Sequence, residues 1–311
     1  MRFLTNFTLI VLFFGIVSCQ FSWDSKEVTI TPNVNDSLSY VITGYSNDVR
    51  LKEVSGMVKS LRFPGHFWVH NDSGDNPVIF RVNDSLQIIQ EVVLIGAQNI
   101  DWEDAAISEY MGEPVLFIGD IGDNLAVRNS VSIYLINEPL SDQTSMEVNR
   151  KIELEYEDGS RDAEMLLFDS ITSEILIVTK RDIPSRVYSF PINSSENKGI
   201  LIFEGHLKLS DNSTLEPNEI YRITGGDSST KGEVILKNYH SVYYYSPNSG
   251  LNIKDRLIAD SPVKIEYQRE LQGEAIALDQ NGYWVTSECA DDGKNHIPQP
   301  LYFYRGFKTI E

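Results

Sequence analysis

One short pattern recurs five times along the chain, and an internal repeat constrains a fold more than any other feature of a sequence. The copies begin at Ser55, Glu103, Glu164, Gly225 and Glu274, at intervals of 48, 61, 61 and 49 residues. Each copy continues, after a turn, with an apolar strand, clear at 67–70, 115–118, 175–178 and 283–286 and weaker at 233–236. A third strand follows at 78–82, 131–135, 187–190, 242–245 and 301–304. Strands of this kind, separated by Gly, Asn and Asp turns, predict an all-β repeat protein.

Five copies of this strand pattern predict a β-propeller with five blades. A compact four-stranded blade takes roughly 40 to 45 residues, somewhat less than the intervals of this chain. A six-bladed propeller is the alternative, with a degenerate repeat hidden in 210–221. A β-sandwich with irregular insertions is the other architecture that these strands allow.

The last copy is too short to complete a blade by itself. Only 37 residues follow Glu274, which is enough for three strands, and a missing fourth strand would leave unpaired backbone groups at an edge. Residues 38–44, before the first repeat, have strand character. We expect this N-terminal strand to pair with the last blade and close the ring, so that the propeller domain covers residues 37–311.

The first nineteen residues have the features of an export signal. Arg2 precedes an apolar stretch over 9–17, which is shorter than the roughly 20 residues of a transmembrane helix. The bacterial lipobox, in which a cysteine is acylated and becomes the mature N-terminus, is similar to the run Ile16-Val17-Ser18-Cys19. We predict a lipoprotein signal peptide at 1–18 and a lipidated tether at 19–36. Lipidation of Cys19 would hold the protein at a membrane of the bacterial cell envelope, periplasmic or surface-exposed.

The charge balance excludes one class of partner. The 311 residues include 45 Asp and Glu against 26 Lys and Arg, and the formal net charge is -19. Phosphate backbones are bound through Lys and Arg, so nucleic acid is not an expected partner. Anionic head groups should also repel the acidic body, which leaves the lipid as the membrane anchor. We expect a monomer.

Acidic residues gather at the start of the first strands, which line the central axis of a propeller. The axial carboxylates and their alternating neighbours are Glu103, Glu164, Glu274, Asp227, Asp101 and Asp162. Crowded carboxylates repel one another unless some are protonated or a cation lies among them. Oxygen ligands without His or Cys favour a hard ion, so we predict Ca²⁺ as the cofactor. The structural alternative is that these side chains accept backbone N–H groups of the neighbouring blade.

The second strand of a blade runs back antiparallel, so its end lies on the same face as the start of the first strand. The polar residues at these ends are His70, Asp72, Asp120, Asp123, Lys180, Arg181 and Glu288. Lys180 and Arg181 would compete with a metal ion for the carboxylates or receive an anionic ligand. The Asp-rich loops 71–76 and 119–124 lack EF-hand spacing, and Asx turns are their structural interpretation.

Five strings of this chain resemble a group of secreted bacterial propellers. They lie at 68–74, 99–104, 119–124, 179–181 and 272–275. The group is similar to the SdiA-regulated propeller family and, more distantly, to the esterase-like domain named after phytase. The resemblance covers about residues 52–305 and implies a five-bladed fold with a calcium ion near the axis. It implies no particular reaction, and the fourth repeat departs from the pattern because 224–227 contain no axial Glu.

No common catalytic motif is present in the sequence: G-x-S-x-G, H-E-x-x-H, a P-loop and G-x-G-x-x-G are all missing. The first interpretation is therefore a binding module that presents one polar face to a glycan, a peptide or a phosphorylated small molecule. The alternative is a Ca²⁺-dependent phosphoester or ester hydrolase of phytase-like type. Its catalytic candidates are Glu103 or Asp120 to activate water, Lys180 and Arg181 to stabilise charge, and His70, for which a structural hydrogen-bonded role is the simpler reading.

Overall fold

The strands expected from the repeats are all present in a computed structural model of the chain. The model describes residues 40–311 except 193–194, 210, 212, 248–250, 271, 292–295, 308 and 310–311. The predicted signal peptide, Cys19 and the tether lie outside the described residues. Among the described residues, no helix combines the length and apolar character needed to cross a membrane.

Each repeat folds as an antiparallel meander, built by period-two strands and tight turns. The first strands are β2 (Val54–Lys59), β6 (Trp102–Tyr110), β11 (Ala163–Asp169), β15 (Ile223–Ser228) and β19 (Gly273–Asp279). The second strands are β3 (His66–Asn71), β7 (Glu113–Asp120), β12 (Glu174–Thr179), β16 (Val234–Asn238) and β20 (Gly282–Ser287). The third strands are β4 (Val78–Asn83), β8 (Val131–Asn137), β13 (Arg186–Pro191), β17 (Val242–Tyr245) and β23 (Gln299–Arg305).

The outermost strands complete the sheets, and a few short elements connect them. The outer strands are β5 (Ile88–Ile95), β10 (Arg150–Tyr156), β14 (Lys198–His206), β18 (Val263–Ile265) and β1 (Tyr40–Ser46). The connecting elements are η1 (Val49–Leu51), β9 (Ser145–Glu147), α1 (Pro217–Ile220), α2 (Ile253–Ala259), β21 (Ala290–Asp291) and β22 (His296–Ile297).

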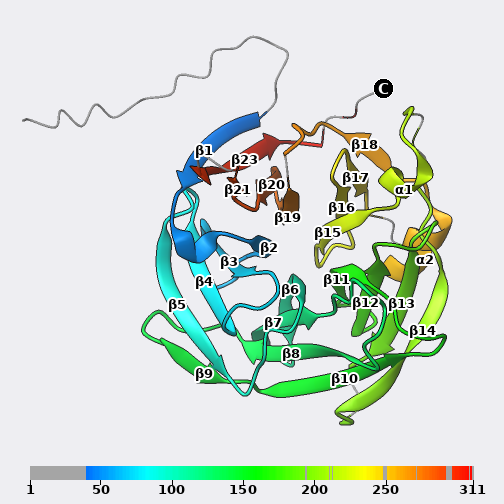
Figure 1. Cartoon of the computed structure of the whole chain (residues 1–311), viewed down its shortest axis with the longest axis horizontal. Coiled ribbons are helices and arrows are strands. Elements are labelled where there is room, and N and C mark those ends of the chain that lie inside the picture. Colours follow the sequence, from blue (N-terminus) through cyan, green and yellow to red (C-terminus); the bar gives the residue numbers. More distant parts are fainter. Residues whose placement is uncertain are drawn as a thin grey trace, which may run out of the picture. The chain divides into compact units, whose positions relative to one another are not determined.

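The first strands lie side by side in a ring around a central axis (Figure 1). Strand β2 contacts β6, β6 contacts β11, β11 contacts β15, β15 contacts β19, and β19 contacts β2 again. The meanders radiate from this ring, and their edge strands form its circumference (Figure 1). The chain is therefore mostly β structure with a propeller-like arrangement.

The N-terminal strand pairs with the last sheet, as its strand character predicted. Strand β1 is antiparallel to β23, with Tyr40 opposite Tyr304 and Ser46 opposite Gln299. In the described part of 210–221, where a sixth repeat was the alternative, the regular element is the short helix α1 and no strand is present.

Two parallel pairings link neighbouring repeats at the circumference, and the sequence pattern did not predict them. Strand β10 pairs in parallel with β14, and β5 pairs in parallel with β9. The first of these pairings creates one sheet of eight strands in the order β11-β12-β13-β14-β10-β8-β7-β6. These pairings cover backbone edges that would otherwise be open to another chain.

The hydrophobic core is divided among the interfaces between neighbouring sheets. Phe117 and Phe168 stack across one interface with ring centroids 4.5 Å apart, and Trp102 packs against Tyr134 in another cluster. Burial of each large apolar side chain contributes about 1.5–3 kcal/mol. Because the hydrophobic side chains pack between the sheets, the polar residues are left at the ends of the axial strands.

Candidate functional site

Each of the five axial strands carries a β-bulge at the same place. The register slips between Val54 and Gly56 in β2, and at the equivalent point in the other four strands. The residues inserted by the bulges are Ser55, Glu103, Glu164, Thr224 and Glu274. A bulge adds one unpaired residue and redirects its side chain. We call these five positions the bulge ring.

The fourth bulge corrects the expectation for Asp227. Thr224 occupies the bulge position, where its hydroxyl donates to the Gly273 carbonyl at 3.2 Å. The Asp227 carboxylate accepts the Ser228 N–H at 2.7 Å and the Leu278 N–H at 2.8 Å. Asp227 therefore follows the structural alternative, in which an acidic side chain joins two neighbouring blades, and it leaves the predicted axial metal set.

The second strands end at equivalent positions in all five repeats. Their last residues face the residue just before each bulge, as Asn71 faces Val54 and Asp120 faces Trp102. The next residues along the chain are Asp72, Ile121, Lys180, Tyr239 and Glu288. We call these positions the strand-end ring. The bulge ring and the strand-end ring share one end of the axis, which we call the mouth.

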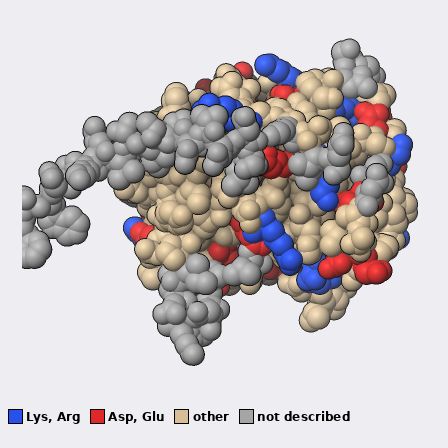
Figure 2. Space-filling model, turned by 90° about the horizontal axis from the view of Figure 1, so that it is seen from above, with Lys and Arg blue, Asp and Glu red and all other residues tan. Residues whose placement is uncertain are grey.

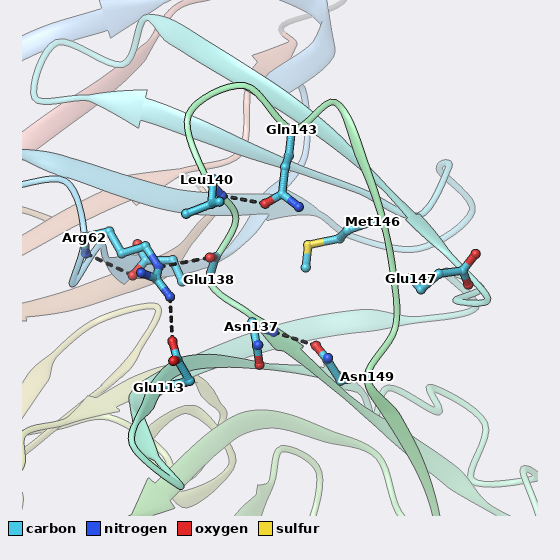
Figure 3. A pocket seen from close by; sticks show the side chains of 9 residues that line it. All are labelled: Arg62, Glu113, Asn137, Glu138, Leu140, Gln143, Met146, Glu147 and Asn149. Atoms are coloured by element: carbon cyan, nitrogen blue, oxygen red, sulfur yellow. Dashed lines mark hydrogen bonds and ion pairs between the residues drawn. The ribbon is translucent and has the colours of Figure 1, made fainter.

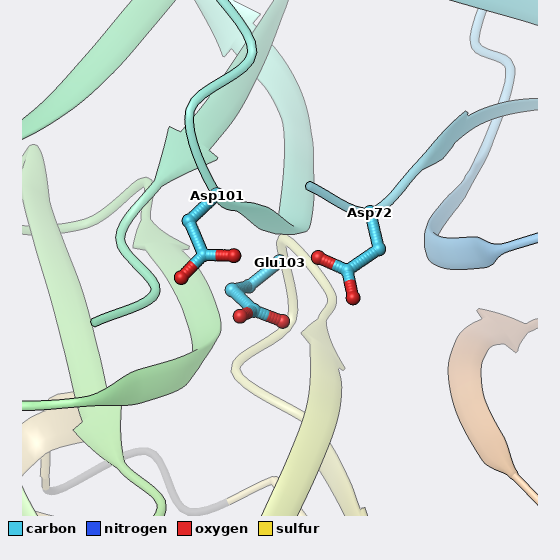
Figure 4. Close-up of side chains that lie close together, drawn as sticks. All are labelled: Asp72, Asp101 and Glu103. Atoms are coloured by element: carbon cyan, nitrogen blue, oxygen red, sulfur yellow. The ribbon is translucent and has the colours of Figure 1, made fainter. Parts of the chain in front are cut away.

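Three carboxylates converge at the mouth from two neighbouring blades. One oxygen from each of Asp72, Asp101 and Glu103 lies within 4.8 Å of the other two (Figure 4). Asp72 belongs to the strand-end ring, Glu103 to the bulge ring, and Asp101 directly precedes β6. This acidic trio could bind a metal ion through oxygen ligands alone.

Hydrogen bonds between the blades hold the acidic trio together. The Asn99 side-chain amide donates to the Asp72 carbonyl at 2.7 Å, and its oxygen accepts the Trp102 N–H at 3.1 Å. The Asp101 N–H donates to the Asp120 carboxylate at 3.1 Å. Asp120 also pairs with Arg128 at 2.9 Å. Asp120, a catalytic and binding candidate, is fully buried and positions the Asp101 backbone.

Gly122 closes the trio from the second blade. Its N–H donates to the Asp101 carbonyl at 3.1 Å. A Cβ on Gly122 would clash with the side-chain carboxylates of Glu103 and Asp101, so an added methyl group would have to displace them.

Replacing Gly122 with alanine is expected to lower the cation affinity of the mouth by at least tenfold, because the methyl group would push Asp101 and Glu103 apart. Misplacing supporting groups of a metal site commonly costs 10- to 100-fold in affinity. Calorimetric titration with Ca²⁺ measures this change. Leu125→Ala is the control, since Leu125 lies in the same loop and is 81% exposed. An unchanged affinity in Gly122→Ala would contradict the geometry.

Burial and mutual repulsion raise the pKa of every carboxyl in the acidic trio. Burial, opposed mainly by a hydrogen bond from Ser73, raises the pKa of Asp72 to about 7. Burial and the neighbouring Asp162 raise the pKa of Asp101. Burial and the Glu164 carboxylate raise the pKa of Glu103 well above its usual value. A bound cation would reverse these shifts by stabilising the ionised forms.

Lys180 lies on the other side of the mouth, between two glutamates. Its ammonium forms an ion pair with Glu164 and lies 3.8 Å from Glu274 Oε1. It also donates to the Tyr239 hydroxyl at 3.1 Å. The predicted competition between Lys180 and a metal ion is thus divided in space: Lys180 lies beside Glu164 and Glu274, whereas Glu103 belongs to the trio.

Tyr239 belongs to this network and was missed in the sequence. Its hydroxyl donates to Glu274 Oε1 at 2.7 Å. Aligning Asn238-Tyr239 with Thr179-Lys180 as equivalent strand ends would have identified it. The weak fourth repeat obscured that alignment.

The remaining acidic and basic candidates form a framework under the loops. Asp162 accepts the Asp123 N–H at 2.9 Å and pairs with Arg181 at 2.6 Å, and Arg181 also donates to Asn124. The Asp123 carboxylate accepts the N–H groups of residues 127 and 128 at 3.0 and 2.7 Å. In the second Asp-rich loop, Asp123 therefore accepts backbone hydrogen bonds, as the structural interpretation of this loop predicted.

His70 and Glu288 have different surroundings. His70 is buried, packs edge-on against Trp102, and places Nδ1 3.1 Å from the Asn71 carbonyl oxygen. Burial lowers its pKa to about 4, which keeps the imidazole neutral. Glu288 accepts from Gln272, and burial together with the Glu274 charge raises the pKa of Glu288 to about 8. Glu288 thus belongs to the mouth, and His70 lies beneath it.

A cavity of about 550 Å³ lies away from the mouth, where β7 begins and β8 ends (Figure 3). The Arg62 side chain borders it and donates to Glu113 at 3.0 Å and to the Glu138 carbonyl at 3.1 Å. The buried Glu138 carboxylate accepts from Trp68 at 2.9 Å, so it is already used within the fold. None of the residues predicted for the functional site lines this cavity.

Basic and acidic side chains are mixed on the described surface seen in Figure 2. Ion pairs account for part of this mixing. Lys254, for example, lies 3.0 Å from both Glu174 and Glu204.

Comparison with known proteins supports the fold. No family model matches the sequence, and no curated protein matches it. The Malassezia sympodialis allergen Mala s 1 matches with a TM-score of 0.50 and 11% identity over 85% of this chain and 96% of the allergen. The PQQ-bound aldose sugar dehydrogenase of Streptomyces coelicolor matches with a TM-score of 0.41 and 11% identity over 85% and 98%. The nidogen/laminin complex matches with a TM-score of 0.40 and 10% identity over 76% and 73%. At identities of 10–11%, such likeness concerns the fold alone.

Proposed function

We propose that this protein is a lipid-anchored, extracytoplasmic propeller whose mouth binds Ca²⁺ and presents a face for a ligand or partner. The observation that carries the proposal is the acidic trio of Asp72, Asp101 and Glu103, with oxygens within 4.8 Å of one another. Ca²⁺ takes six to eight oxygen ligands in flexible geometry. Three carboxylates would leave coordination positions for water and for oxygen atoms of a bound molecule.

A five-bladed ring is part of this proposal. Its support is the closed order of contacts among the five axial strands, together with the β1 strand that completes the last sheet. The five bulges at equivalent positions support the same count, because each blade contributes one residue to the bulge ring. The relation to the SdiA-regulated and phytase-named groups is likewise proposed, on the sequence strings alone.

The membrane anchor at Cys19 is proposed from the lipobox, and the topology gives it a consequence. Strand β1 begins at Tyr40, opposite Tyr304, and Tyr304 lies next to the end of β23 that is farther from the mouth. Cys19 precedes Tyr40 by about twenty residues, which span at most about 70 Å when extended. Strand β1 therefore starts at the opposite end of the axis from the mouth.

The ligand we propose for this face is a glycan, a peptide or a phosphorylated small molecule that completes the coordination of the ion. Ca²⁺-dependent phosphoester or ester hydrolysis is the second candidate, because an ion with open positions polarises a phosphoryl or carbonyl oxygen. Binding is favoured, since the basic residues required for hydrolysis are already engaged. Lys180 is paired with Glu164, and Arg181 with Asp162.

Saturating Ca²⁺ is expected to raise the melting temperature of the purified protein relative to EGTA. An ion at 100 times its Kd stabilises the folded state by about 2.7 kcal/mol. Asp101→Asn and Glu103→Gln should abolish the shift, because each removes a charged ligand. Asp142→Asn, an exposed acidic residue outside the mouth, should retain it. Equal melting temperatures in Ca²⁺ and EGTA for the unaltered protein would refute the metal site, and a phosphoester screen on the same samples tests hydrolysis.

A further inference from the structure

The mouth contains a second pair of carboxylates that the acidic trio does not use. Glu164 is 4% exposed and Glu274 is 5% exposed, and they come from different blades of the bulge ring. The Lys180 ammonium lies between them, paired with Glu164 and 3.8 Å from Glu274 Oε1. Two buried carboxylates at one place require a positive charge or protons.

The surroundings of this ammonium are those of a built cation site. Tyr239 contributes its hydroxyl oxygen at 3.1 Å from the Lys180 nitrogen and its ring centroid at 5.3 Å. The second oxygen of Glu164 is buried and has no hydrogen-bond partner among the described residues. Burying a carboxylate oxygen without a partner costs free energy, so this oxygen can accept one more contact from a positively charged group. The side chain of Lys180 is itself only 6% exposed.

We propose that Lys180 fills a second cation subsite of the mouth, formed by Glu164, Glu274 and Tyr239, which binds a free divalent cation when the ammonium is removed. The inference deepens the proposed function and rests on it, because it takes the acidic trio to bind one exchangeable ion. Lys180 then limits the mouth to that single ion. A lysine ammonium is a compact point charge on a covalent stem, so it occupies the subsite permanently and offsets one of its two carboxylate charges.

This arrangement has a consequence for the ligand. Two-ion sites clamp both oxygens of a reacting group between ions about 3.5–4 Å apart. In the proposed mouth the ammonium occupies the second subsite, so a bound ligand meets a single exchangeable ion, the one at the trio. The chemistry supported is therefore recognition of a ligand oxygen by one ion.

Calorimetric titration with Ca²⁺ tests the subsite on the full chain. The unaltered protein should bind one ion and Lys180→Ala two, and methylammonium should compete with the second ion because it restores the missing ammonium. Lys180→Ala combined with Glu164→Gln should return to one ion. Lys254→Ala is the matched control, because Lys254 also bridges two carboxylates at 3.0 Å but is 19% exposed, and it should still bind one ion.

Each result has a distinct meaning. One ion in a folded Lys180→Ala variant overturns the inference and leaves the proposed function standing. No ion in the unaltered protein and one in Lys180→Ala refutes the trio as a Ca²⁺ site and supports the subsite. A second ion in Lys254→Ala shows that any glutamate pair bridged by a lysine suffices, which overturns the inference. If Lys180→Ala unfolds in EGTA, circular dichroism follows its refolding on addition of Ca²⁺ or methylammonium. Refolding with one of these cations supports the inference, and failure to refold with both overturns it.

Discussion

Replacing Asp104 with alanine is expected to lower the free energy of unfolding by about 3–5 kcal/mol. Asp104 is 2% exposed and links three blades through its carboxylate. It accepts the N–H groups of Ala105 at 2.9 Å, Leu166 at 2.9 Å and Gly226 at 3.3 Å. Alanine would leave these buried donors without an acceptor, and each costs about 1–3 kcal/mol. Urea denaturation measures the loss.

Two further variants show whether the loss comes from the link between blades. Asp104→Asn keeps one side-chain oxygen and should lose less than Asp104→Ala. Asp142→Ala removes an exposed carboxylate and should change the free energy of unfolding by less than about 0.5 kcal/mol. A loss in Asp104→Ala no larger than in Asp142→Ala would show that the three contacts do not hold the ring together.

The second large effect is the response of stability to pH when Ca²⁺ is absent. We expect stability to be greatest near pH 4 and to fall by about 3–5 kcal/mol up to pH 8. The pKa of Asp72 rises from 3.8 to about 7 on folding, and that of Glu288 from 4.5 to about 8. At a pH between the unfolded and the folded pKa values, folding therefore takes up protons. The stabilisation by these protonated carboxyls is complete below the unfolded pKa and is lost as the pH rises through the folded pKa. One pKa unit corresponds to about 1.36 kcal/mol, and coupling between the two groups keeps their effects from adding fully.

Ca²⁺ should flatten this pH dependence by favouring the ionised carboxylates. Melting temperatures in EGTA and in Ca²⁺ at pH 5, 6.5 and 8 measure the difference, which should be largest at pH 8. Asp72→Asn should reduce the slope in EGTA, because it removes one of the groups that take up a proton. If stability instead rises from pH 5 to pH 8 in EGTA, then buried, mutually repelling carboxylates do not destabilise the mouth, and the prediction is wrong.

Much of the fold could be predicted because its signals are local. Strand alternation, turn residues and the repeat interval lie within short windows of the sequence, and the edge left by the last repeat required a partner such as β1. The parallel pairings of β10 with β14 and β5 with β9 had no such signal. They depend on how neighbouring sheets meet at the circumference.

The candidate site was predicted in part. Asp101 and Glu103 were predicted among the axial metal ligands and Asp72 among the ligand-binding residues at the strand ends, and the structure brings these three together. Asp227 was assigned to the axis because the fourth repeat was aligned on Gly225, one residue after the bulge at Thr224. A shift of one residue moves a side chain to the other face of a strand, so this misalignment changed the expected role.

The amino-acid sequence by itself determined the repeated strands, the closing strand and the excess of carboxylates at one end of the axis, since all three follow from local patterns and their period. Only the tertiary structure decided which carboxylates meet a neighbouring carboxylate, which meet Lys180, and which accept backbone N–H groups. Several of those partners come from different blades, as Lys180 and Glu274 do, or Asp227 and the Leu278 N–H. Their pairing depends on bulge register and on packing between blades, which no local pattern encodes.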